Sequence, residues 1–276
     1  MVGNGRRTRK QQARSEPAQR QSLSTRIAYK DEQEVIDQTA AVRDTNIYFY
    51  PSESELGRRV LLALRDGSFK KRERPDFECT SPEALFLLEE MKVDDHVRTG
   101  KRRKDRSRSN EAEFVAELQE SGLLEIFPNA RIVTNVSSGL GTDRDHNYSS
   151  YVEHFARNIR KHARNNAHYR AQLAGASLGY LVFDESSAYF ESRSEGSAFG
   201  LGMVGRPHNW YCDQAFMSII LESGADFIVW MTPYKLMRSQ ELGYMRLPEM
   251  TIIDVGLLRI DEFDTYDLER MKSTEN

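Results

Sequence analysis

The alternation of apolar and polar positions predicts a strand followed by a helix soon after residue 45. Residues 46–50 are β-prone, and a proline ends that run. Ser52 with Glu55 three residues later is typical of a capping box at a helix start. We therefore expect a helix over residues 53–64 that stops at Asp66-Gly67.

A short apolar run at residues 84–88 is bounded by turn signals, a pattern typical of a strand buried on both faces. The strand then continues into a charged segment. Because side chains alternate along a strand, Glu90 and Lys92 should share one face, whereas Glu89 and Met91 should share the other. The pattern thus places an acid and an amine together at the rim of a core sheet.

The other periodic segments complete an α/β pattern with no internal repeat. A glycine-rich loop is expected at residues 195–206, and the chain becomes acidic after Asp261, where we expect it to fray. Further helices are predicted at 27–43, 110–122, 147–173 and 210–221, and further strands at 68–79, 130–137, 178–184, 226–231 and 251–255.

Length and composition indicate one globular domain. A chain of 276 residues can bury one sizeable core, which we assign to residues 26–276. Residues 1–25 are polar and basic, so they are expected to form a disordered arm. No apolar run approaches the ~18 residues that would span a bilayer, and membrane partners are not expected. The two cysteines, Cys79 and Cys212, fit the reducing cytoplasm.

Positive charge is concentrated although the formal net charge is −3. One concentration is the arm and the other is the loop at residues 100–110. Such a loop could hold phosphates without reading base sequence, and a solvated loop without a ligand is the other interpretation. The residues proposed to contact nucleic acid are Lys101, Arg102, Arg103, Lys104 and Arg106.

The candidate chemistry centres on an acid and an acid-x-lysine triplet. Lys92 alone among the lysines has an acid two positions earlier, and Pro75 alone among the prolines precedes an aspartate. Mg²⁺ prefers hard oxygen ligands, so Asp76, Glu90 and the backbone carbonyl of Met91 are the candidate metal ligands. Lys92 could orient the attacking water or neutralise charge on the phosphate.

These residues resemble the motif of the PD-(D/E)XK nuclease superfamily, over about residues 50–185. The resemblance implies an α/β fold of the restriction-endonuclease-like type, with a mixed central sheet flanked by helices. It also implies catalytic residues Asp76, Glu90 and Lys92, with Mg²⁺ or Mn²⁺ as cofactor. Many members carry a further metal-binding acid on the first helix, where Glu53 or Glu55 stands; we favour Glu53.

The expected function is therefore a Mg²⁺-dependent phosphodiesterase, a DNA endonuclease of the restriction or phage-defence type. The partners would be DNA and, as in many members of the superfamily, a second copy of the chain. Two alternatives stay open. One is a non-catalytic nucleic-acid-binding or regulatory protein with the same fold, and the other is an RNA-cleaving member.

The position of Asp76 relative to Glu90 depends on the turn that joins their two strands. A tight hairpin turning at residues 80–83 would set Asp76 opposite Leu87 rather than Glu90. The two acids would then converge only with a wider turn or a staggered sheet. Glu78 is the substitute if they do not.

Other polar clusters are interpreted as structural. Consecutive strand residues point to opposite faces, so residues 94–96 are expected to be a solvated strand exit rather than one metal site. Residues 143–147 are expected to cap the helix that follows, and Asp184 and Glu185 are left out of the site. The histidines of that helix lack the spacing that lets two imidazoles share a zinc ion.

Overall fold

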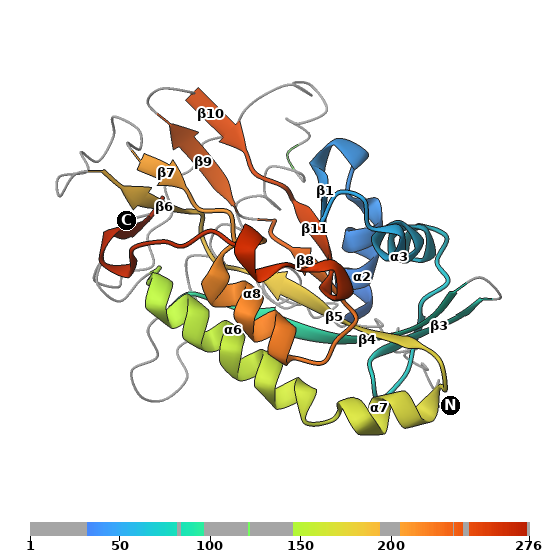
Figure 1. Cartoon of the computed structure of the whole chain (residues 1–276). Coiled ribbons are helices and arrows are strands. Elements are labelled where there is room, and N and C mark those ends of the chain that lie inside the picture. The colour runs from blue at the N-terminus through green and yellow to red at the C-terminus, as the bar shows by residue number, and fades with distance from the viewer. Residues whose placement is uncertain are drawn as a thin grey trace, which may run out of the picture.

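A seven-stranded mixed sheet organises the chain (Figure 1). The computed structural model describes residues 32–81, 84–96, 121, 146–193, 205–233, 235–239 and 243–274. Across the sheet the strands are β1 (Ile47–Tyr50), β11 (Met250–Asp254), β8 (Phe227–Met231), β5 (Ser177–Asp184), β4 (Ala84–Val93), β3 (Phe77–Ser81) and β2 (Lys70–Lys71).

Two smaller sheets accompany it. One pairs β9 (Leu236–Ser239) with β10 (Gly243–Arg246), and the other has the order β12 (Met271–Ser273), β6 (Tyr189–Ser192) and β7 (Gly205–Pro207). The described part of the chain is thus of mixed α/β class, as expected. None of its helices combines the length and apolar character needed to cross a membrane.

Helices cover both faces of the large sheet (Figure 1). On one face lie α2 (Glu32–Ala41) and α3 (Glu55–Arg65), and on the other lie α6 (Tyr148–Ala163), α7 (Asn166–Gln172) and α8 (Gln214–Glu222). Short 3₁₀ turns are η1 (Asp44–Asn46), η2 (Val255–Leu257), η3 (Ile260–Glu262) and η4 (Leu268–Arg270).

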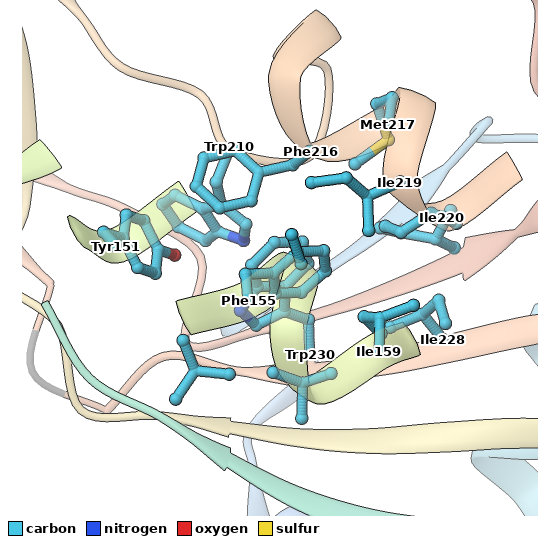
Figure 2. Packing of buried hydrophobic residues seen from close by; sticks show 14 of the residues in the cluster. Tyr151, Phe155, Ile159, Trp210, Phe216, Met217, Ile219, Ile220, Ile228 and Trp230 are labelled. Atoms are coloured by element: carbon cyan, nitrogen blue, oxygen red, sulfur yellow. The ribbon is translucent and has the colours of Figure 1, made fainter. Parts of the chain in front are cut away.

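An aromatic core holds α6 and α8 against the sheet. Figure 2 shows Phe155 of α6 beside Trp230 of β8, and their rings stack with centroids 4.6 Å apart. Phe216 of α8 meets both rings edge-on. All three side chains are fully buried, and burying one large apolar side chain contributes about 1.5–3 kcal/mol. This core fixes the position of α6 over β4 and β5.

Strand β4 lies inside the sheet, as its apolar run predicts. It pairs in parallel with β5 and antiparallel with β3. Leu88 packs in the core beneath α2 and α3, whereas Met91 packs in the core beneath α6. By alternation, Glu90 and Lys92 therefore share the α2/α3 face of the strand, which confirms the sequence prediction.

The start of α3 differs from the prediction, whereas its end does not. Ser54, not Ser52, is the N-cap, and its hydroxyl accepts the Gly57 N–H at 2.8 Å. The same hydroxyl donates to Asp254 at the end of β11 at 2.9 Å, and this tertiary contact selects the later cap. The helix stops at Asp66, and Gly67 follows with φ of 70°, a conformation that glycine adopts without strain.

Two further segments correct the sequence prediction. The long helix expected at residues 147–173 is broken at Arg164 and Asn165 into α6 and α7. The expected fraying after Asp261 is wrong as far as Thr274, because β12 pairs with β6 and buries Met271. The basic arm, the basic loop and the elements predicted at 110–122 and 130–137 lie outside the described residues, apart from Ser121.

Candidate active site

The β3–β4 hairpin brings Asp76 to Glu90. Phe77 pairs with Leu88 and Ser81 with Ala84, so two residues alone connect the strands. Asp76, one position before β3, therefore falls level with Glu89. A hairpin turning at residues 80–83 would have set Asp76 opposite Leu87; the observed turn is centred one residue later, which moves the partner by two residues. Glu78 takes that place and pairs with Arg72 instead.

A direct hydrogen bond joins the two predicted metal-binding residues. The backbone N–H of Glu90 donates to Oδ2 of Asp76 at 2.7 Å. The Asp76 carbonyl in turn accepts the Arg72 N–H at 2.8 Å, which fixes the backbone just before β3. The Asp76 carboxylate is thus held beside the strand position that carries the Glu90 side chain.

Both carboxyl groups resist ionisation in this arrangement. Burial raises the pKa of Glu90 to about 7, and the nearby acids Glu32 and Asp76 add to the shift. Burial likewise raises the pKa of Asp76 to about 6; the Glu90 N–H opposes the shift and Glu89 adds to it. Acids that destabilise each other's charged forms are stabilised when a cation lies between them.

One oxygen of Glu90 has no hydrogen bond. Its Oε2 is buried and receives no donor from the part of the chain that the structure describes. A buried polar atom without a partner costs about 1–3 kcal/mol, more when it is charged. Hard carboxylate oxygens suit Mg²⁺ or Mn²⁺, so the donor set fits the predicted metal.

Lys92 reaches an acid that the sequence analysis had left out. Its Nζ lies 2.5 Å from Oε1 of Glu185, whose side chain is only 8% exposed. The N–H of Glu185 bonds the Val93 carbonyl at 2.8 Å, so the parallel pairing of β5 with β4 places this acid. An acid directly after a buried strand was the available signal, but the sequence does not show which strands are neighbours.

The acid supplied by a helix is Glu32, not Glu53. Glu32 opens α2, forms an ion pair with Lys71 at 3.1 Å and contributes to the raised pKa of Glu90. Glu53 is exposed in the turn before α3, where its carboxylate accepts the Ser52 hydroxyl at 3.1 Å. Glu55 is also exposed and pairs with Arg58. The structure therefore moves the helix acid from α3 to α2.

The backbone carbonyl of Met91 faces away from Asp76. Within a strand, the N–H and C=O of one residue point to the same side, and neighbouring residues alternate. The Glu90 N–H points to Asp76, whereas the Val93 carbonyl points to β5. The Met91 carbonyl, two positions before Val93, is thus directed toward β5. It does not lie where the prediction places a metal ligand.

A second polar cluster lies just beyond β4. The strand ends at Val93, so the alternation argument used for residues 94–96 does not apply to them. Asp95 is fully buried and contacts His146, which corrects the expectation of a solvated exit. Asn147 caps α6 by accepting the Ser150 N–H at 2.9 Å, as predicted for this segment.

The histidines of α6 bind separate acids. His154 Nδ1 lies 2.7 Å from Asp94, and His162 Nδ1 lies 2.7 Å from Glu89 on the face of β4 opposite Glu90. Asp184 accepts the Trp230 indole N–H at 3.0 Å and lies 3.4 Å from the buried Lys235 ammonium. These contacts support the interpretation of those groups as structural.

Comparisons of the chain with protein-family models, with curated proteins and with solved structures give no match. Of the predicted site residues, Asp76, Glu90 and Lys92 come together at one end of β3 and β4. Glu185 pairs with Lys92, and Glu32 lies near enough to add to the raised pKa of Glu90.

Proposed function

We propose that the chain is a metal-dependent phosphodiesterase, and specifically a DNA endonuclease of the restriction or phage-defence type. The observation that carries the proposal is the hydrogen bond from the Glu90 backbone N–H to the Asp76 carboxylate, which brings together two half-buried acidic residues with raised pKa values. Lys92 stands two residues after Glu90 on the same face of β4. Acids and an amine in this relation are suited to hydrolysis of a phosphodiester.

The order of elements supports the same proposal. A helix (α3) is followed by the antiparallel strands β2, β3 and β4, then by helices α6 and α7 and the parallel strand β5. The four strands are neighbours in the order β2-β3-β4-β5. The acid precedes β3 and the Glu-x-Lys triplet lies on β4, an arrangement similar to the PD-(D/E)XK superfamily. Strands β8, β11 and β1 extend the sheet beyond that core.

Each residue has a role that follows from its chemistry. Asp76 and Glu90 would hold Mg²⁺ or Mn²⁺, with Glu32 as a nearby third acid. When bound, the ion would supply an activated water and neutralise charge on the phosphate. Lys92 would direct its ammonium group to the attacking water or to a phosphate oxygen. Glu185 would hold that ammonium group in position through the ion pair between them.

The test is nicking of supercoiled plasmid DNA with Mg²⁺ or Mn²⁺ by the full chain. Asp76→Asn, Glu90→Gln and Lys92→Met should each lower the rate by about 10²-fold or more, the usual cost of removing one group that stabilises a transition state. Glu53→Gln, an exposed change outside the cluster, should leave the rate within about twofold. Circular dichroism would verify that every variant is folded.

The outcomes separate the proposed site from its alternatives. Equal nicking by the wild type and the three site variants would place the activity elsewhere. DNA binding without cleavage by any of them would favour a non-catalytic nucleic-acid-binding protein. A parallel assay on a single-stranded RNA would reveal an RNA-cleaving enzyme. The basic loop with Lys101, Arg102, Arg103, Lys104 and Arg106 stays a prediction that phosphate-binding assays of those variants would test.

A further inference from the structure

Asp95, His96 and His146 form a compact group at the end of β4 and the start of α6. One ligand atom from each residue lies within 4.8 Å of the others. Asp95 and His146 are buried, His96 is half-buried, and the two imidazole rings have centroids 5.1 Å apart. The group is separate from Asp76 and Glu90 and contains nitrogen ligands, which that site lacks.

The contact between Asp95 and His146 has an unusual shape. Nδ1 of His146 lies 3.2 Å from both carboxylate oxygens, whereas a charge-assisted hydrogen bond normally brings one oxygen to about 2.7–2.9 Å. Two ligands on a tetrahedral ion with bonds of about 2.0–2.1 Å are separated by about 3.3 Å. The observed separation matches the edge of such a tetrahedron more closely than a single hydrogen bond.

The Asp95 carboxylate is held as metal-binding carboxylates commonly are. Oδ2 accepts the N–H of Ser187 at 3.0 Å, the Ser187 hydroxyl at 3.0 Å and the Tyr189 hydroxyl at 2.7 Å. For Oδ1 the contact described is that with His146. Outer partners on one oxygen orient the other toward an ion.

The backbone of His146 adopts a costly conformation. Its φ is +52°, and it is the one described residue other than glycine with positive φ. Such a conformation costs about 1 kcal/mol or more and tends to persist at functional sites. The next residue, Asn147, donates its N–H to the Asp95 carbonyl at 2.8 Å. The strained turn thus keeps the imidazole of His146 against Asp95.

We propose that Asp95, His96 and His146 bind a zinc-class transition-metal ion that clips the end of β4 to the start of α6. Two imidazoles and a carboxylate suit Zn²⁺ or Co²⁺ better than Mg²⁺, and water would complete four-coordination. His96 and His146 also bracket residues 97–145. Joining the two ends of so long a segment limits the freedom of the unfolded chain, which increases stability.

The test is titration of the chelator-stripped full chain with Co²⁺, monitored by visible absorption. A tetrahedral site with nitrogen ligands should give intense bands at one equivalent that Zn²⁺ then removes. His96→Gln and His146→Asn should each weaken Co²⁺ binding by about 10²-fold or more. Asparagine is chosen because it tolerates positive φ. His168→Gln, an exposed change on α7, is the matched control and should bind as the wild type does.

Several results would overturn the proposal. The first is the absence of tetrahedral Co²⁺ bands in the wild-type chain. Bands that persist in both histidine variants would also contradict it. So would bands that Asp76→Asn removes, since these would belong to the carboxylate site. Loss of the bands in His96→Gln with nicking activity unchanged would support the metal clip independently of the proposed nuclease.

Discussion

Glu90 and Asp95 are two acids on either side of the end of β4, and their environments act in opposite directions. Asp95 is fully buried, yet its pKa is held below the usual range: burial would raise it, but the contact with His146, the charges of His146 and His96, and the Tyr189 hydroxyl outweigh that effect. Glu90 is only half-buried, yet its pKa rises to about 7.

The supply of donors and cations explains the difference. Asp95 receives hydrogen bonds from Ser187 and Tyr189 and contacts His146. Glu90 is near Asp76 and Glu32, and its Oε2 has no donor among the described residues. Burial alone therefore does not determine the charge of an acid in this protein. Asp95 is held as an anion by its donors, whereas Lys92 and Lys71 offset only part of the burial of Glu90, which would gain further from a bound cation.

The largest expected effect on stability is that of replacing Asp95. Asp95→Ala removes the acceptor of the Ser187 N–H and of the Tyr189 hydroxyl, at about 1–3 kcal/mol for each buried donor, and also removes the contact with His146. We expect the free energy of unfolding to fall by about 4 kcal/mol in urea denaturation with chelator present. Asp261→Ala, an exposed aspartate on η3, is the control. A loss below about 1 kcal/mol would show that the donors are not satisfied mainly by Asp95.

A smaller loss is expected at the amine of the candidate site. Lys92→Met removes the ion pair that Lys92 forms with the buried Glu185 carboxylate. Lys92 is itself 39% exposed, so solvent screening limits the loss to about 1–2 kcal/mol of unfolding free energy. Chemical denaturation beside Lys70→Met, an exposed change on β2, would measure it. Equal stability of the two variants would mean that water already solvates Glu185.

The smallest expected effect is a gain in stability, when Glu90 is replaced by glutamine. The folded chain binds more protons at Glu90 than the unfolded chain does between about pH 4, near the ordinary pKa of glutamate, and its raised pKa of about 7. The contribution of this group to stability is therefore present below pH 4 and is lost as pH rises through 7. Glu90→Gln should raise the Tm at about pH 8 by about 2 °C without metal, and should not raise it at about pH 4.

Metal should reverse the difference in Tm between the wild type and Glu90→Gln at about pH 8. Mg²⁺ or Mn²⁺ should raise the Tm of the wild type at about pH 8 and leave that of Glu90→Gln unchanged, because binding to the folded chain stabilises it by mass action. Thermal scans with and without metal measure both effects, with Glu269→Gln as an exposed control. A variant less stable than the wild type at pH 8 without metal would contradict the assignment of Glu90 as an acid in need of a cation.

Local patterns predicted most of the described elements. The apolar run of β4, the β-prone residues of β1 and the Asp66-Gly67 stop of α3 are decided by residues within a few positions of one another. The predictions were wrong where distant residues decide the structure. Asp254 selects Ser54 as the cap of α3, and pairing with β6 orders the segment after Asp261.

The candidate site likewise has features that local sequence decides and features that distant residues decide. Glu90 and Lys92 share a face because alternation is a local property of a strand. The contact with Asp76 depends on the position of a two-residue turn, which the sequence left open. Glu185 and Glu32 were missed because strand order and helix placement bring them near β4. The spacing of residues along the chain reveals neither the order of the strands nor the placement of the helices.

The pairing of β1 with β11 has a consequence for the time course of synthesis. Strand β1 pairs with β11, and the hydrogen bond between Ser54 and Asp254 joins residues 200 positions apart. Ribosomes add about 5–20 residues per second, so β1 waits about 10–40 s before its partner exists. During that interval its edge is open to other chains in the cell. A chaperone that shields β1 should therefore improve the yield of folded protein more than one acting after release from the ribosome.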